Sequence, residues 1–399
     1  MSSKVLVINS GSSSIKYQLL DGVSGESLAT GLLERIGQPV GAIKHEGPQG
    51  KTVLEQPVVD HEAGIATILE LFAAHGPQLD PKDLAAVGHR VVQGGARFSG
   101  PAVIDDEVES AIEELSTLAP LHNPPNLDGI RAARRAFPDL PHVAVFDTSF
   151  HATLAPESYT YAIDRDVARE HGIRRYGFHG TSHAYVTQRT AELLGKDPAD
   201  VNVIIAHLGN GASITAVRGG RSVETSMGLT PLEGLVMGTR SGDIDPAVIF
   251  HLQRVAGMST DEIDALLNRR SGMLGLAGAS DMRDIHDAIA AGDQDARLAL
   301  DVYCHRLKHY VGAYYAHLGR VDAVVFTAGA GENDDVVREL SLTGLERLGI
   351  QVDPVRNEGR KKTDTVISPD GAEVTVLVVP TNEELEIARE ALATIAREA

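Results

Sequence analysis

Three cationic side chains lie in glycine-flanked segments of this sequence, where they could hold a negatively charged ligand. Arg90, His179 and Arg240 each have a glycine within two residues. Glycine lets a ligand approach the backbone closely, and a guanidinium can bind a carboxylate or a phosphate through two hydrogen bonds. An arginine in a loop is more often only solvated, so each residue alone indicates no site. Together, the three would clamp an anion if the fold brought them close.

Oxygen-bearing side chains follow three predicted strands. Asn9, Asp147 and Glu383 come after the apolar runs 5–8, 142–146 and 374–379. Oxygen ligands at strand ends suit Mg²⁺, which keeps several waters and bridges substrate phosphates. The alternative is helix capping, especially for Glu383, which stands at the start of a predicted helix. His179 and His183 have the spacing of a zinc motif, but Gly180 replaces the glutamate that this motif requires, which argues against zinc.

Two similar hairpins are predicted about half a chain apart. Residues 5–20 and 203–217 each read as an apolar strand, a glycine-containing turn with a hydroxyl group, and a second apolar strand. Such a turn can surround a phosphate with N–H and O–H donors. A third turn, Gly329-Ala330-Gly331, follows another predicted strand and is a weaker nucleotide signal. The repeated hairpins indicate a duplicated domain and resemble those of the actin-like and sugar-kinase-like ATPases.

Helical and strand patterns alternate along the chain, which predicts an α/β fold. Around residues 120–126 two adjacent prolines predict a non-helical loop. A loop is also expected at 226–246, and Thr381 with Glu384 fits a capping box. Helices are predicted at 63–74, 108–118, 127–137, 183–194, 261–268, 295–317 and 385–397 and from near Asp334, with strands at 84–92, 142–146, 321–327 and 374–379.

Composition excludes several classes of protein. The chain has 399 residues, of which 43% are hydrophobic and 23% charged, so two globular domains are expected. A net charge of −19 argues against nucleic acid or an anionic membrane surface as a partner. Cys304 is the single cysteine, and neither a signal peptide nor a membrane span is recognisable, so we expect a protein of the reducing cytoplasm.

The motifs together resemble the acetate kinase family, within the acetate and sugar kinase/Hsp70/actin superfamily. The resemblance runs nearly from end to end and rests on residues 5–16, 88–92, 119–126, 145–150, 176–183, 207–213, 225–246 and 380–384. It implies duplicated ribonuclease-H-like domains with an active-site cleft between them. Residues 1–150, with the C-terminal helix 384–399 packing back, would form the first domain, and residues 151–383 the second, nucleotide-binding domain. It also implies a homodimer that uses ATP with Mg²⁺, or alternatively Mn²⁺.

The resemblance also assigns roles by matching position. Asp147, His179 and Arg240 would be catalytic, with His122 nearby, and Asn9 and Glu383 would lie at the metal. Arg90 would bind the carboxylate of acetate, and Val92, Leu121, Phe178 and Pro231 would surround its methyl group. ATP would contact Ser12, Ser14, Lys16, His207, Leu208, Gly209, Asn210, Gly211, Asp281, Met282, Arg283, Gly329, Ala330, Gly331, Glu332 and Asn333.

The expected reaction is direct in-line transfer of the γ-phosphoryl group from ATP to acetate. The acceptor is already ionised at neutral pH and needs no general base, so we interpret Asp147 as holding Mg²⁺ or its water. Three positions, Glu224, Met282 and Ala330, depart from the family's common residues, and the last two leave nucleotide preference open. The alternatives are a kinase that prefers propionate or butyrate and a non-catalytic, ATP-gated interaction protein of the same fold.

Overall fold

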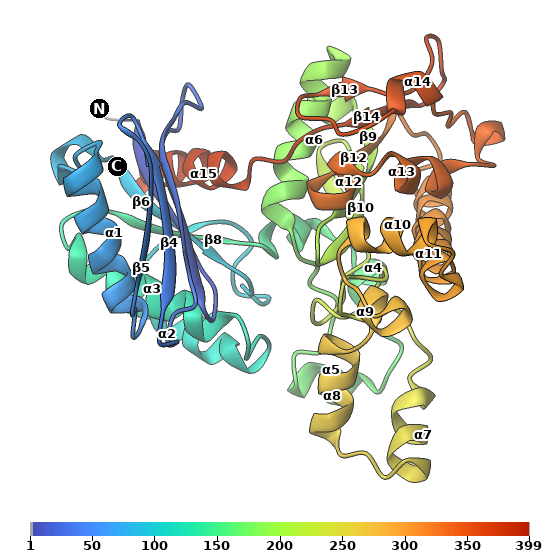
Figure 1. Cartoon of the computed structure of the whole chain (residues 1–399), viewed down its shortest axis with the longest axis horizontal. Coiled ribbons are helices and arrows are strands. Elements are labelled where there is room, and N and C mark those ends of the chain that lie inside the picture. Colours follow the sequence, from blue (N-terminus) through green and yellow to red (C-terminus); the bar gives the residue numbers. More distant parts are fainter. Residues whose placement is uncertain (1–2, 399) are drawn as a thin grey trace. The chain divides into compact units, whose positions relative to one another are not determined.

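The computed structural model describes residues 3–398, which fall into two compact units (Figure 1). Unit 1 comprises Met1–Ala152 and Asn382–Ala399, and unit 2 comprises Thr153–Thr381. Each unit is built around its own mixed β-sheet. Among the described residues, no helix has both the length and the apolar composition needed to cross a lipid bilayer.

Unit 1 has an eight-stranded sheet in the order β5-β4-β3-β2-β1-β6-β8-β7. Strands β1 to β5 form an antiparallel meander, whereas β6 is parallel to β1 and β8 is parallel to β6. The elements are β1 Lys4–Ser10, β2 Ser14–Asp21, β3 Ser27–Glu34, β4 Gly41–Gly47, β5 Gly50–Gln56, α1 His61–His75, β6 Ala86–Val91, β7 Ala102–Val103, α2 Asp106–Glu114, α3 Asn123–Ala136, β8 His142–Phe146 and α15 Glu383–Glu398, with 3₁₀ turns at Pro81–Asp83, Leu115–Thr117 and Ser149–Thr153.

Unit 2 has a six-stranded sheet in the order β11-β10-β9-β12-β14-β13. Its elements are α4 Pro156–Tyr159, α5 Arg165–Glu170, α6 Gly180–Leu194, β9 Asn202–Leu208, β10 Ala212–Arg218, β11 Arg221–Thr225, α7 Ala247–Val255, α8 Thr260–Arg269, α9 Gly272–Ala277, α10 Met282–Ala290, α11 Gln294–Leu318, β12 Ala323–Thr327, α12 Ala328–Asn333, α13 Asp335–Leu342, α14 Pro354–Asn357, β13 Thr365–Val366 and β14 Thr375–Val378, with 3₁₀ turns at Pro198–Asp200 and Glu346–Leu348.

The two sheets share one strand plan, which confirms the duplicated α/β fold. The order β3-β2-β1-β6-β8 in unit 1 matches β11-β10-β9-β12-β14 in unit 2, with the same antiparallel and parallel pairings. Both sheets then end in a short antiparallel strand, β7 or β13. Because the parallel strands of a unit end at one edge of its sheet, residues that follow them gather there.

The last helix belongs to the first unit. Helix α15 follows β14 in the chain, but it packs against β6, β1 and β8 of unit 1, where Figure 1 shows it in red beside the blue strands. A Cβ atom on Gly88 would lie 2.8 Å from Cγ2 of Ile387, so the missing side chain of this glycine allows helix and strand to approach closely. Glu383 and Glu384 therefore begin this helix within unit 1.

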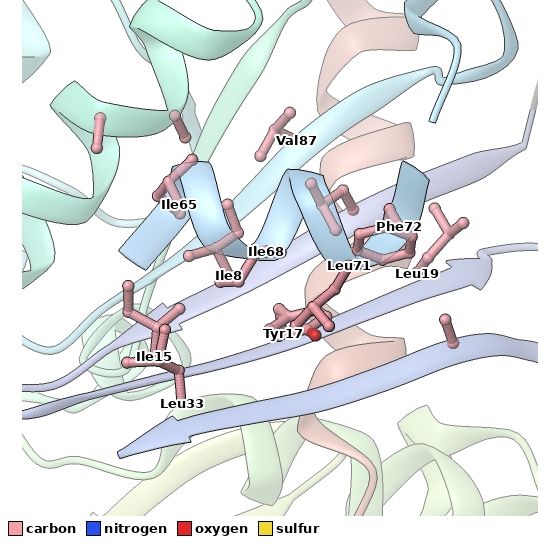
Figure 2. Packing of buried hydrophobic residues seen from close by; sticks show 14 of the residues in the cluster. Ile8, Ile15, Tyr17, Leu19, Leu33, Ile65, Ile68, Leu71, Phe72 and Val87 are labelled. Carbon is pink, nitrogen blue, oxygen red and sulfur yellow. The ribbon is translucent and has the colours of Figure 1, made fainter. Parts of the chain in front are cut away.

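The core of unit 1 lies between its meander and α1. Tyr17 lies at its centre (Figure 2), with its hydroxyl 2.8 Å from Nδ1 of His45. The side chains that pack around it alternate along the strands and recur at helical spacing in α1: Ile8, Ile15, Leu19, Leu33, Ile65, Ile68, Leu71, Phe72 and Val87. This core supports the first predicted hairpin, in which Asn9 pairs with Lys16.

Two predicted loops are helical instead. Pro124 and Pro125 lie in the first turn of α3, where the missing N–H groups of proline have no helical partner to lose. The segment 328–333 forms helix α12 directly after β12, because Ala328 adopts a left-handed backbone (φ 63°) that turns the chain at the strand end. Helices α4, α5, α7, α9, α10 and α14 were not predicted.

Two predicted helix starts also differ. Helix α6 begins at Gly180 rather than at His183. The capping box of Thr381 and Glu384 does not form, because α15 begins at Glu383 and its cap is Asn382, whose Oδ1 accepts a 3.1 Å hydrogen bond from the N–H of Leu385. Glu384 pairs with Lys16 instead.

Candidate active site

A buried arginine–carboxylate pair links the ends of two parallel strands in unit 1. Arg90 lies near the end of β6 and Asp147 directly follows β8. Nε and Nη2 of Arg90 donate to Oδ1 and Oδ2 of Asp147 at 3.0 and 2.7 Å. Asp147 is buried, and the bidentate pair stabilises its ionised form. Nη1 of Arg90 makes no hydrogen bond within the described residues and is thus available to an anion.

More carboxylates surround Arg90. Burial opposes the charge of its guanidinium, but Asp147, Glu383 and Glu384 overcome that effect and raise the pKa of Arg90 above its usual value. Glu384 is itself paired with Lys16, whose Nζ lies 2.5 Å from Oε1. This lysine, expected to contact ATP, is half exposed at its side chain and bound to unit 1's own carboxylate. Glu384 is therefore a site residue that the sequence reasoning missed.

The loop after β6 is held by two asparagines from the first turns of α3. Asn126 accepts a hydrogen bond from the N–H of Val92 at 3.0 Å and donates to the carbonyl of Ser10 at 2.6 Å. Asn123 bonds in the same way to both the N–H and the carbonyl of Gln93, at 3.0 Å. These amides position Val92 relative to β1. The Asn-Pro-Pro-Asn sequence was a signal for them, but it was interpreted only as a loop.

The remaining predicted residues of unit 1 differ in exposure. Val92 is buried, whereas Leu121 is half exposed and lies, with His122, just before α3. Ser12 is exposed at the tip of the first hairpin, and Ser14 begins β2 and accepts a 2.8 Å hydrogen bond from the N–H of Gly11.

Asn9 and Glu383 keep oxygen atoms available for a metal ion. Both side chains are partly exposed, and neither makes a hydrogen bond or an ion pair within the described residues. Among residues 3–398 there is no group of three or more His, Cys, Asp or Glu side chains that could hold a metal by itself. The donors present suit Mg²⁺, which takes few protein ligands and fills its shell with water and phosphate oxygens.

In unit 2, His179 and Arg240 both lie close to Gly211. A Cβ atom on Gly211 would lie 3.2 Å from Nη1 of Arg240 and 3.7 Å from Nε2 of His179. His179 has a left-handed backbone (φ 56°, ψ 26°) at the start of α6, an unfavourable conformation for a residue other than glycine. The structure thus brings together two of the three predicted catalytic residues with a predicted ATP-binding glycine.

Arg240 is a partly buried cation without an anionic partner. Its Nη1 donates to the carbonyl of Pro231 at 3.2 Å and lies 3.9 Å from Sδ of Met237. Across residues 3–398 no carboxylate forms an ion pair with it, and burial lowers the pKa of Arg240. A guanidinium in this state gains stability from any anion that enters beside it. Phe178, expected at the acetate methyl group, is buried next to His179.

Three histidines of unit 2, His179, His183 and His207, form a connected polar cluster. His179 Nδ1 and His183 Nε2 lie 3.0 and 2.8 Å from the hydroxyl of Ser213. The ring of His207 stacks on that of His179, with centroids 4.2 Å apart, and its Nδ1 lies 2.8 Å from Oγ of Ser182. Ser182, His183 and Ser213 are buried; sequence reasoning considered His183 only for a zinc motif and did not assign a role to Ser182 or Ser213.

A cavity of about 870 Å³ opens among the segments that were expected to bind the nucleotide. The predicted residues Gly209, Asn210, Asp281, Met282, Arg283, Gly329, Ala330 and Asn333 line it, and so do Met273, His286, Tyr303, Asp334 and Arg360, which were not predicted. His207, Leu208, Gly211, Gly331 and Glu332 do not line it. Hydrogen bonds from Arg283 lower the pKa of Asp281 to about 2.

Gly331 and Glu332 brace the cavity wall instead. Arg338 is fully buried and donates to the carbonyl of Gly331 at 3.0 Å and to that of Gly359 at 2.9 Å. Oε1 of Glu332 accepts hydrogen bonds from the N–H groups of Ala328 and Thr381 at 2.8 and 3.3 Å. Burial raises the pKa of Glu332. These contacts tie α12 to the ends of neighbouring segments.

Comparison with known proteins identifies close relatives. A model of the acetokinase family matches residues 4–389. The acetate kinase of Leifsonia xyli subsp. xyli is 60% identical over 394 residues, which cover 99% of both chains. Among solved structures, Porphyromonas gingivalis acetate kinase superposes with a TM-score of 0.94 at 45% identity (99% of this chain, 100% of that one). A Francisella tularensis propionate kinase superposes with a TM-score of 0.90 at 41% identity (98% and 99%).

Mutation of Asn126 tests whether its side-chain amide positions Val92. Replacing Asn126 with Ala leaves a buried N–H and a buried carbonyl without partners, which we expect to lower the free energy of unfolding by about 1–3 kcal/mol or more. Thermal and denaturant unfolding measure the change. Asn126→Asp keeps the acceptor for Val92 but sets a carboxylate against the carbonyl of Ser10, so it should be no better than Ala. Wild-type stability in both variants would contradict the bridging role.

Proposed function

The chain belongs to the acetokinase family, and we propose that it catalyses the reversible transfer of the γ-phosphoryl group of ATP to acetate, which gives acetyl phosphate and ADP. It is thus a phosphotransferase with a carboxyl group as acceptor. The structural observation that carries the proposal is Arg240, a partly buried cation that has no anionic partner among residues 3–398 and lies with His179 beside Gly211. A phosphoryl group in transfer spreads negative charge over its oxygens, and such donors stabilise that charge.

In this reaction a carboxylate oxygen of acetate forms a bond to the γ-phosphorus as the bond to the ADP oxygen breaks. Acetate is already ionised at neutral pH, so no proton has to be removed. Nη1 of Arg90 would hold the acetate carboxylate, and Val92, Leu121, Phe178 and Pro231 would contact its methyl group. His179 and Arg240 would donate to the oxygens of the transferring group, with His122 nearby. The proposed mechanism uses Arg90 of unit 1 and His179 and Arg240 of unit 2.

Other residues are proposed to bind ATP and Mg²⁺. The cavity lined by Met282, Arg283, Gly329 and Ala330 suits the nucleoside, and Ser12, Ser14, Lys16 and the segment 207–211 suit the phosphates. Asn9 and Glu383 would hold Mg²⁺, or Mn²⁺, with Asp147 holding the ion or its water. When bound, the ion would neutralise phosphate charge. The pair with Arg90 favours this role of Asp147, since it stabilises the carboxylate and not the protonated acid.

We propose that the protein acts in the cytoplasm as a homodimer. Its one cysteine, Cys304, is buried and free, as is usual in a reducing compartment. None of the nine residues of α7, all of them in the described part of the chain, is buried, although the helix carries Val248, Phe250 and Val255. A helix with this apolar surface is suited to packing against a second copy.

The reaction can be tested directly by trapping acyl phosphate with hydroxylamine. We expect hydroxamate to form from acetate with ATP and Mg²⁺ and not without acetate. The ratio kcat/KM should be highest for acetate and lower for propionate and butyrate, since an added methylene in a fitted pocket costs about 1–3 kcal/mol. Higher values for propionate or butyrate would reassign the substrate. ATP binding without hydroxamate from any acid would instead indicate a non-catalytic ATP-gated protein.

Mutation of Arg240 tests whether this residue stabilises the negative charge of the transferring phosphoryl group. Arg240→Ala should lower kcat by about 10³-fold or more, as loss of a phosphoryl-stabilising arginine does in other enzymes. Arg240→Lys keeps the charge but not the planar fork, so we expect it to recover only part of the activity. The matched control is Arg269→Ala, which removes an exposed arginine at the end of α8. Near-normal turnover of the Arg240→Ala enzyme would refute the role.

The dimer proposal is tested at α7. Phe250→Glu combined with Val255→Glu places two charges on the apolar surface of the helix, and we expect dimer dissociation to increase by at least about tenfold. Sedimentation or light scattering over a concentration series measures it. Val23→Glu, at an exposed apolar residue of unit 1, should leave the assembly unchanged. An unaltered dimer in the double variant would exclude α7 from the interface.

A further inference from the structure

One hydroxyl group in unit 2 contacts two histidines. Oγ of Ser213, on β10, lies 3.0 Å from Nδ1 of His179 and 2.8 Å from Nε2 of His183. Ser213 and His183 are both completely buried. A serine hydroxyl has one proton to donate, so it can donate a hydrogen bond to at most one of these histidines. The other histidine can bond to Ser213 only by donating its own N–H to Oγ. The direction of these two hydrogen bonds therefore determines which ring nitrogens of His179 and His183 carry protons.

The opposite nitrogen of His179 faces the proposed phosphoryl site. Nε2 of His179 lies 3.7 Å from the position of a Cβ on Gly211, and Nη1 of Arg240 lies 3.2 Å from the same position. The ring is also fixed in plane by His207, which stacks on it at an angle of 18°. Nδ1 therefore meets Ser213 while Nε2 faces the region that Arg240 makes favourable to anions.

Charge and hydrogen-bond direction select one arrangement. If Nδ1 of a neutral His179 donated to Ser213, the ring would present the lone pair of Nε2 to a phosphoryl oxygen and repel it. If both nitrogens carried protons, the charged ring would lie beside the guanidinium of Arg240, which disfavours a second cation. A neutral ring with its proton on Nε2 avoids both conflicts and can donate to the phosphoryl group.

We propose that His183 and Ser213 are positioning residues that hold His179 in this tautomer. In the proposed relay Nε2–H of His183 donates to Oγ of Ser213, and O–H of Ser213 donates to Nδ1 of His179. Nε2–H of His179 then donates to the transferring phosphoryl group, and each bond of the relay polarises the next. This inference deepens the proposed function and rests on the role of His179 in it.

Kinetics of matched hydroxyl deletions test the relay. Ser213→Ala should lower kcat by about 10-fold to 100-fold, less than the roughly 10²–10³-fold cost of removing a donor to transition-state charge outright. KM for acetate and for ATP should stay within about twofold. Thr215→Val is the control, since it removes another buried hydroxyl of β10, one that bonds to Thr225 and to no histidine. Equal losses of kcat in both variants would show that Ser213 contributes only to packing and would overturn the proposal.

A conservative replacement tests His183 separately. The amide nitrogen of Gln can take the place of imidazole Nε2 as a donor to Ser213, whereas Leu cannot donate at all. We expect the His183→Gln enzyme to have a kcat at least about tenfold above that of His183→Leu, with both folded by circular dichroism. Equal activity of the two folded variants would overturn the donor role.

Spectroscopy separates the relay from catalysis. In protein labelled with ¹⁵N-histidine and saturated with ADP, His179 should carry its proton on Nε2 and none on Nδ1, with its signals assigned by their loss in His179→Asn. Asn tolerates the left-handed backbone at this position. A proton on Nδ1 would overturn the relay. Full activity of His179→Asn would instead refute the role of His179 in the proposed function, whatever the tautomer, while hydroxamate formation would still test the function itself.

Discussion

Partly buried positive charge is the constraint on which the proposed chemistry of both units depends. In unit 1 the guanidinium of Arg90 is balanced by Asp147 and by the nearby Glu383 and Glu384. In unit 2 the guanidinium of Arg240 bonds to the carbonyl of Pro231 and the sulfur atom of Met237 and forms no ion pair within the described residues. In unit 1 the ion pair with Asp147 fixes Arg90 and leaves Nη1 without a hydrogen bond within the described residues. In unit 2 an incoming anion would stabilise the charge of Arg240. These are the requirements for holding a carboxylate and for stabilising a transferring phosphoryl group.

The duplicated sheet explains how these groups are positioned. Each unit repeats three antiparallel strands followed by two parallel ones, and the parallel strands deliver their following residues to one edge. Arg90 and Asp147 meet because β6 and β8 are neighbours. His207 and Ser213 face each other across the β9–β10 hairpin. Rigid strands therefore carry the polar groups, while glycines such as Gly211 leave room next to them.

A further layer of side chains orients those that would touch substrate. Asn126 fixes the backbone of Val92, Arg338 braces Gly331, and Ser213 contacts His179. Each of these three supporting side chains is buried. The proposed catalysis would therefore depend on these supporting side chains as much as on the groups at the reacting atoms.

The sequence by itself determined the α/β class, the duplicated hairpins, the family and the site candidates Arg90, His179 and Arg240, because apolar periodicity and glycine-flanked motifs are local signals. It misjudged the prolines at the start of α3, because proline fits the first turn of a helix as well as a loop, and the helix at 328–333, because that conformation depends on how the chain turns at the end of β12. Only the tertiary structure decided that Asp147 pairs with Arg90, that Lys16 pairs with Glu384, and that Ser213 joins two histidines. Of these partners, His183 and Ser213 are 30 residues apart in the chain, and Lys16 and Glu384 are 368 residues apart. Only packing determines which of these distant groups meet.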